Sequence, residues 1–183
     1  MVHPHEFNVS TILFFGANQE YLLSIDNGLA PSMFISLWQS YTCLHQKYLP
    51  RGLKNQPAIN YYCGYSNANN YMVIAGNYPA QYTFSIWYFE GEKLDMLLEN
   101  NEDTLANCLG VHVFEKTSSF AFAIVEKRCI KYWKLDGKKL LLVNRVHVKE
   151  DIMDTQLNPD KNFLLFLNEH GRVYIINKEV KTI

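Results

Sequence analysis

The chain has 183 residues, of which 48% are hydrophobic and 19% charged, and this composition is ordinary for a globular protein with one substantial core. Its 17 basic and 18 acidic residues give a formal net charge of −1 without a block of like charges, so nucleic acid is not expected as a main partner. The longest unbroken apolar run, Phe120 to Val125, is far shorter than the roughly 20 residues of a membrane span, and Met1 to Phe7 does not resemble a signal peptide.

The first unit of the chain is predicted to form four β-strands. Twelve Tyr, eleven Phe and three Trp favour pleated sheets over helices. Gly16-Ala17-Asn18 is typical of a chain reversal between the first two strands. The expected strands are Val9 to Phe15, Tyr21 to Asp26, Phe34 to Trp38, and Thr42 to Tyr48.

The second unit repeats this order and leaves one alternative open. Glu90-Gly91 suits a tight hairpin, because glycine takes a positive φ without steric cost. Leu94 to Leu109 could instead be helical, since its leucines can share one face, but Asn100 to Asp103 interrupts the run and favours a loop. The expected strands are Ile59 to Tyr65, Tyr71 to Ala75, Phe84 to Trp87, and Leu94 to Glu99.

The third and fourth units follow the same pattern, and the last is incomplete. Asp136-Gly137 repeats the hairpin signal of Glu90-Gly91. Only Lys181-Thr182-Ile183 remains to begin a final outer strand. The expected strands are Leu109 to Phe114, Phe120 to Val125, Cys129 to Trp133, and Leu140 to Arg145, then Ile152 to Leu157, Asn162 to Leu167, and Arg172 to Ile176.

The last large apolar residue of each third strand serves as an anchor, and these anchors recur evenly. Trp38, Trp87, Trp133 and Ile176 are separated by 49, 46 and 43 residues. A period of about 40 to 45 residues is typical of a four-stranded propeller blade. The sequence therefore predicts an all-β fold, a β-propeller of about four four-stranded antiparallel blades, at about residues 5–48, 57–99, 104–145 and 147–183.

These residues resemble the WD-repeat family. His5, Ser24, Asp26 and Trp38 stand where the family's His, Ser, Asp and Trp stand in a blade, so the resemblance implies a side-chain network in the first unit. In the fourth unit, the resemblance rests on His147 and on Asp160 in the turn Asn158 to Lys161, but its anchor Ile176 has no indole to donate. The chain departs from the family pattern because no Gly-His pair and no Trp-Asp pair occurs in it.

Two insertions indicate which members of the WD-repeat family the chain resembles most. Asn27 to Ser32 and Gly76 to Gln81 are similar to loops of the large cilia- and flagella-associated WD-repeat proteins, and of WD-repeat scaffolds that bind mitogen-activated protein kinases. The resemblance implies a cytoplasmic protein-interaction scaffold, in the cytoskeleton or a ciliary axoneme, with a free signalling adaptor as the alternative. The candidate partner-binding residues are Asn27, Pro31, Arg51, Lys54, Tyr78 and Pro79.

About three and three-quarter blades fall short of the four to eight blades that are typical of a closed propeller ring. Propellers close because each blade packs on two neighbours, so an open arc leaves two apolar faces in water. We expect the ring to be completed by further residues of a longer polypeptide or by another protein chain. The alternative is a self-closed four-bladed ring in which Met1 to Phe7 adds an edge strand.

The chain shows no pattern that predicts catalysis or a cofactor. Nucleophile elbows and phosphate-binding loops are absent from the sequence. We expect no metal, because His3 and His5 lack a third ligand at recognisable spacing among the six histidines and four cysteines. The rival interpretation is an enzyme or small-ligand propeller with a site in its central channel.

Overall fold

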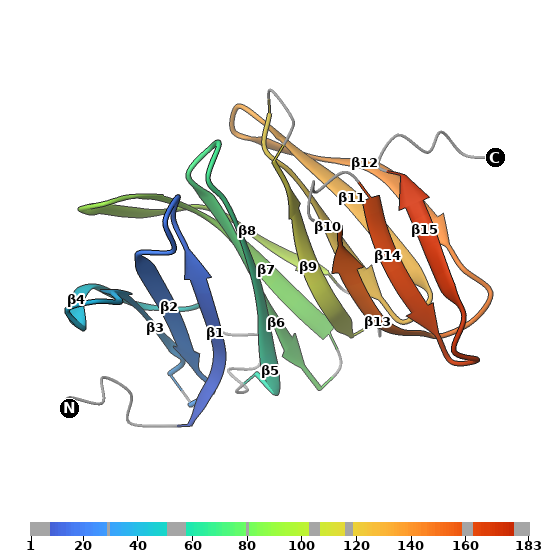
Figure 1. Cartoon of the computed structure of the whole chain (residues 1–183), viewed down its shortest axis with the longest axis horizontal. Helices are drawn as coiled ribbons and strands as arrows, with labels where there is room; N and C mark the ends of the chain where they lie inside the picture. The colour runs from blue at the N-terminus through green and yellow to red at the C-terminus, as the bar shows by residue number, and fades with distance from the viewer. Residues whose placement is uncertain are drawn as a thin grey trace.

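A computed structural model describes residues 8–28, 30–50, 58–79, 81–102, 107–115, 119–158 and 163–177. Within these residues all regular elements are strands, which form four antiparallel sheets in chain order (Figure 1). Sheet 1 contains β1 (Val9–Phe15), β2 (Tyr21–Asp26), β3 (Ser32–Leu37) and β4 (Thr42–Tyr48). Sheet 2 contains β5 (Asn60–Ser66), β6 (Tyr71–Tyr78), β7 (Gln81–Glu90) and β8 (Lys93–Glu102). Sheet 3 contains β9 (Cys108–Phe114), β10 (Ala121–Glu126), β11 (Cys129–Asp136) and β12 (Lys139–His147). Sheet 4 contains β13 (Ile152–Leu157), β14 (Phe163–Asn168) and β15 (Val173–Asn177).

The architecture confirms the predicted all-β propeller of four-stranded antiparallel blades. Neighbouring strands of each sheet are consecutive in the chain. Gly91 and Gly137 have φ of 54° and 58°, and each starts a two-residue hairpin, as their Glu-Gly and Asp-Gly pairs predict. The helical alternative for Leu94 to Leu109 is wrong, because β8 pairs with β7 along its whole length and so satisfies its backbone groups in the sheet.

The insertion predicted at Gly76 to Gln81 is mostly strand. Gly76 and Asn77 pair with Thr83 and Tyr82, so β6 and β7 extend as a long hairpin up to the pair Tyr78–Gln81. The Gly and Pro in this segment predict a loop. Gly76 instead makes room for an aromatic ring, since a Cβ at this position would meet the Tyr61 ring at 2.7 Å.

The core consists of three apolar clusters, and each lies between two successive sheets. The face of a sheet that packs on the preceding sheet is called here its leading face, and the opposite face its trailing face. Trp87 and Phe89 on the leading face of sheet 2 pack on the trailing face of sheet 1, which includes Ile35. Trp133 packs in the same way on Phe84 of sheet 2, with ring centroids 5.4 Å apart.

The fourth sheet repeats this arrangement. Leu164 and Ile176 on its leading face pack with Val125 and Tyr132 of sheet 3. The first strands also lie side by side, β1 with β5, β5 with β9, and β9 with β13. Every junction described therefore joins one trailing face to one leading face.

The anchor of the first unit is displaced by two residues from the position that the sequence suggested. Trp87, Trp133 and Ile176 pair with the second residue of the preceding strand, Met72, Phe122 and Leu164 respectively. In sheet 1 the second residue of β2 is Leu22, and it pairs with Ser36.

Trp38 instead corresponds to Phe89 and Leu135. Its backbone N–H donates to the Glu20 carbonyl at 2.9 Å, and Phe89 and Leu135 donate in the same way to the residues just before β6 and β10. The last large apolar residue of the first unit is therefore Trp38, because the position equivalent to Trp87 holds the small Ser36.

Candidate protein-interaction site

A buried polar residue ends the second strand in three of the four sheets. Asp26, Glu126 and Asn168 are the last residues of β2, β10 and β14, and all three are buried. Asp26 accepts hydrogen bonds from the backbone N–H groups of Gly28 and Ser32, each at 3.2 Å, and from the Ser32 hydroxyl at 2.5 Å. Asp26 therefore fixes the loop that follows it.

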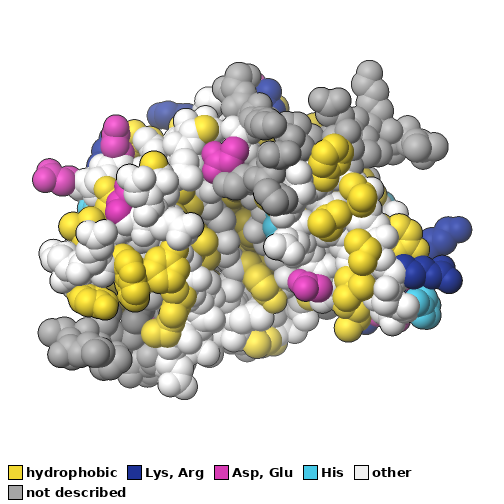
Figure 2. Space-filling model, in the orientation of Figure 1, with side chains coloured by type: hydrophobic (Ala, Val, Ile, Leu, Met, Phe, Trp, Pro, Cys, Tyr) yellow, Lys and Arg dark blue, Asp and Glu magenta, His cyan; other side chains and the backbone are white. Residues whose placement is uncertain are grey.

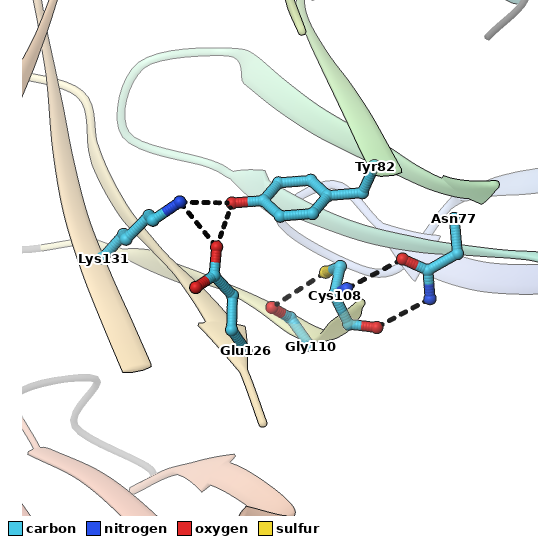
Figure 3. Close-up of polar contacts among 6 residues, drawn as sticks. All are labelled: Asn77, Tyr82, Cys108, Gly110, Glu126 and Lys131. Carbon is cyan, nitrogen blue, oxygen red and sulfur yellow. Dashed lines mark hydrogen bonds and ion pairs between the residues drawn. The ribbon is translucent and has the colours of Figure 1, made fainter. Parts of the chain in front are cut away.

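Glu126 takes part in a buried contact between sheets 2 and 3 (Figure 3). Its Oε1 accepts a hydrogen bond from the Tyr82 hydroxyl at 2.8 Å and forms an ion pair with Lys131 Nζ at 2.6 Å. Lys131 Nζ also donates to the Tyr82 hydroxyl at 3.3 Å. Because both charges are buried, removing one of them would leave the other without compensation, at a cost of about 3–5 kcal/mol.

A side-chain amide reinforces the same junction (Figure 3). Asn77 Oδ1 accepts from the Cys108 N–H at 2.8 Å, and its Nδ2 donates to the Cys108 carbonyl at 2.7 Å. The same Nδ2 also donates to Asn60 Oδ1 at 2.8 Å. The start of β9 is thereby held against sheet 2.

The side-chain network implied by the family resemblance is only partly in place. Trp87 Nε1 donates to Ser85 Oγ at 2.7 Å, whereas the buried Trp133 Nε1 has no hydrogen-bond partner among the described residues. His5 and Asp160 lie outside the described residues. Ser24 pairs with Phe34 in sheet 1, and His147 is exposed at the end of β12.

The predicted partner-binding residues divide between structural and accessible positions. Tyr78 is buried, and its hydroxyl donates to the Pro50 carbonyl at 3.1 Å, so it links β6 to the segment just after β4. Pro31 is also buried, Asn27 is half-buried, and Pro79 is exposed. Arg51 and Lys54 lie outside the described residues.

The histidines in the described part of the chain include two that bridge sheets. His45 Nε2 lies 2.8 Å from the Gly91 carbonyl, and His112 Nε2 lies 2.7 Å from Thr155 Oγ1. Burial lowers the pKa of His112 to about 4, and the negative charge of Asp154 opposes this shift. In the described ranges no three His, Cys, Asp or Glu side chains lie close enough together to hold a metal ion.

A pocket of about 250 Å³ lies between the hairpins of sheets 1 and 2. Tyr21, Tyr65 and Phe89 form its aromatic wall, and Glu20 and Glu90 contribute carboxylates. The pKa of Tyr65 is raised to about 12, mainly by burial and to a smaller extent by Tyr21, Glu115 and Glu20. Both carboxylates already accept hydrogen bonds from the protein, Glu90 from the Tyr88 hydroxyl and Glu20 from the Asn18 N–H. The pocket is therefore better described as a space between two hairpins than as a ligand site.

Large apolar side chains are exposed on the outward faces of the first and last sheets (Figure 2). On the leading face of sheet 1, Trp38 is 41% exposed, and its ring packs edge-on against Phe14 with centroids 4.9 Å apart. On the trailing face of sheet 4, Ile175 is 68% exposed beside Val173 and Phe163. An open arc of blades predicts two such apolar faces, and the structure shows which residues form them.

The same positions are buried in the sheets between them. Ile175 precedes its anchor Ile176 just as Ile35 and Ile86 precede Ser36 and Trp87, and both of these isoleucines are 0% exposed. Phe89 and Leu135, which correspond to Trp38, are buried against the preceding sheet. The two outward faces thus have the composition of junction faces.

Comparisons with known proteins identify the fold. No protein-family model matches the sequence, and no curated protein matches it. Among solved structures, the β-propeller domain of Cps50 (Swd1) from Myceliophteria thermophila is 10% identical with a TM-score of 0.66, over 92% of this chain and 53% of that chain. The WD40 domain of SCAP from fission yeast is 16% identical with a TM-score of 0.69, over 97% of this chain and 41% of that one.

A third structure is the complex of KlAtg21 with the coiled coil of AgAtg16. The similarity has 12% identity and a TM-score of 0.68, over 96% of this chain and 54% of that chain. The chain therefore spans about half the length of the propellers it matches. No helix among the described residues is long and apolar enough to cross a membrane. The chain has the fold of the WD40 β-propellers, and its four sheets are blades of that fold.

Proposed function

We propose that this chain is a protein-interaction scaffold that binds other protein chains through the outward faces of sheets 1 and 4. The observation that carries the proposal is the exposure of Trp38 and Ile175 at positions that are buried at the junctions inside the molecule. Burying one such side chain stabilises a complex by on the order of 1.5–3 kcal/mol. Contiguous exposed apolar surface of this kind marks interaction sites in proteins.

We further propose that the scaffold is a cytoplasmic part of a cytoskeletal assembly of the ciliary or axonemal type. The support is the resemblance of the segment Asn27 to Ser32 to loops of cilia-associated WD-repeat proteins, since Gly76 to Gln81, which resembles such loops in sequence, is mostly strand. The KlAtg21 complex supports a protein partner more generally, because that propeller is bound to a coiled coil.

Site-specific crosslinking tests the interaction. A photoreactive phenylalanine analogue replaces Trp38 or Ile175 in the chain expressed in ciliated cells, and Val143, which is 63% exposed on β12 away from both end faces, is the matched control. We expect crosslinks to protein from positions 38 and 175 and none from position 143. Equal crosslinking at all three positions would contradict the proposed site.

Extraction of the same cells tests the cellular context. We expect the tagged chain to remain with detergent-extracted axonemes, and the Ile175→Asp variant to be released with the soluble fraction. The Val143→Asp variant should be retained. A chain that is released regardless of substitution would contradict the axonemal proposal and leave the interaction site to be judged by crosslinking.

A further inference from the structure

We propose that the partner of both outward faces is a second copy of this chain, joined head to tail into a closed ring of eight sheets. This inference rests on the proposed function and specifies its partner. Each of the three junctions inside the molecule joins a trailing face to a leading face. Sheet 4 offers a free trailing face and sheet 1 a free leading face, so two copies supply each other with the missing half of a junction.

The facing residues match those of an internal junction. Tyr21 at the start of β2 and Phe89 after the anchor of sheet 2 meet across the first junction, with ring centroids 4.9 Å apart in a T-shaped arrangement. Phe163 begins β14 as Tyr21 begins β2, and Trp38 corresponds to Phe89. Phe163 of one copy therefore meets Trp38 of the other, and both side chains are exposed in the single chain.

A second pair of positions corresponds in the same way. Phe84 contacts the Phe122 ring across the second junction, with centroids 5.7 Å apart. Val173 corresponds to Phe84 and Leu22 corresponds to Phe122, since each stands at the same distance from its anchor or strand start. The smaller Val173 would thus lie against Leu22, so both sides of the new junction remain apolar.

The size of the arc suits closure by two copies. Four sheets in each copy give eight, which lies within the range of four to eight blades found in propeller rings. The chain spans 53%, 41% and 54% of three chains whose fold it shares, so two copies together would approximate the length of one such chain. Head-to-tail contacts close into a ring when their rotation fits. A net charge of −1 per copy opposes the association only weakly.

Sedimentation velocity of the purified chain at micromolar concentration tests the proposal. We expect a particle of twice the 21.3 kDa chain mass. A folded monomer at these concentrations would overturn the proposal. If crosslinking from positions 38 and 175 in cells then captured only a different protein, the proposed function would stand without the ring of two copies.

Charge substitutions distinguish a head-to-tail ring from other dimers. Trp38→Asp and Ile175→Asp should each raise the dissociation constant of the dimer by at least about 100-fold, because every ring contains the changed junction twice. Val143→Asp should leave it unchanged. A mixture of the Trp38→Asp and Ile175→Asp chains should recover a heterodimer, since one intact junction remains between them. If one variant alone still dimerised as the parent does, like faces would be paired and the proposal would be overturned.

Crosslinking provides a readout that does not depend on these disruptive variants. One chain carries Phe163→Cys and the other Trp38→Cys, both in a Cys43→Ser background, because Cys43 is exposed. A short bismaleimide should link the two different chains and neither chain to itself. Links within identical chains at the same rate would contradict head-to-tail pairing. Circular dichroism identical to that of the parent checks that each variant is folded.

Discussion

Lys131 occupies in sheet 3 the position that Ser85 occupies in sheet 2, two residues before the anchor tryptophan. Ser85 accepts the indole N–H of Trp87, whereas Lys131 turns to Glu126 and Tyr82. Trp133 is thereby left as an apolar packing residue without a hydrogen-bond partner among the described residues. In place of the Trp–Ser hydrogen bond, sheet 3 has the Glu126–Lys131 ion pair, and both of its side chains bond to the Tyr82 hydroxyl of sheet 2.

Lys131→Met should destabilise the fold by about 3–5 kcal/mol, because the carboxylate of Glu126 would remain buried without its cation. Urea unfolding measures the difference in free energy, and Lys138→Met at an exposed turn is the control. The double variant Lys131→Met with Glu126→Gln should recover much of the loss. A single variant as stable as the parent would show that the pair contributes nothing to the junction.

Stability should decrease in mild acid because of His112. Its pKa is lowered from 6.5 to about 4 by burial, so the unfolded chain binds a proton in this interval and the folded chain does not. Neutral His112 makes its full contribution to the free energy of unfolding above pH 6.5. This free energy decreases by on the order of 3 kcal/mol as the pH falls to about 4. The slope of unfolding free energy against pH should flatten in His112→Gln and persist in His170→Gln, which changes an exposed residue.

The thiols should differ sharply in reactivity. Cys43 is exposed, whereas burial raises the pKa of Cys63 and of Cys108 to about 12 and suppresses their thiolates. Brief treatment of the native chain with iodoacetamide should therefore modify Cys43 alone among these three, as read by peptide mass spectrometry. Denaturant should make all of them reactive. Rapid native labelling of Cys108 would mean that the junction between sheets 2 and 3 opens readily.

Substitution of the tryptophans should separate the true anchor from the displaced one. Trp133→Ala removes a buried ring and should destabilise the fold by about 3–5 kcal/mol. Trp38→Ala should cost less than about 1 kcal/mol, because its ring is already partly in water. Both are measured by thermal unfolding in an Ile175→Asp background, which breaks self-association. Equal losses would contradict the two-residue displacement in sheet 1.

The strand order was predictable because it depends on local signals. Turn residues such as Gly91 and Gly137 indicate hairpins regardless of how the sheets are arranged in space. The spacing of Trp87 and Trp133 indicates the length of a blade. The displacement at Trp38 was not predictable in this way. It depends on which residue pairs with Leu22, and size alone pointed to the tryptophan over Ser36.

The existence of two exposed apolar blade faces was predictable from an incomplete ring, but the residues that form them were not. Ile175 and Val173 alternate along β15 as Ile86 and Phe84 do along β7, so the two strands have the same apolar pattern. Only the arrangement of the sheets distinguishes the covered pair from the exposed one. The contact of Glu126, Lys131 and Tyr82 was missed similarly, because Tyr82 belongs to another sheet and is 44 residues from Glu126.

The fixed order of trailing face against leading face gives the molecule a polarity like that of a filament subunit. A head-to-tail contact can be repeated from copy to copy without limit. Only the rotation between successive copies decides whether the series closes into a ring. A substitution at a junction that changed this angle by a few degrees would convert a discrete particle into an open helical fibre, with every apolar face still covered except those at the two tips.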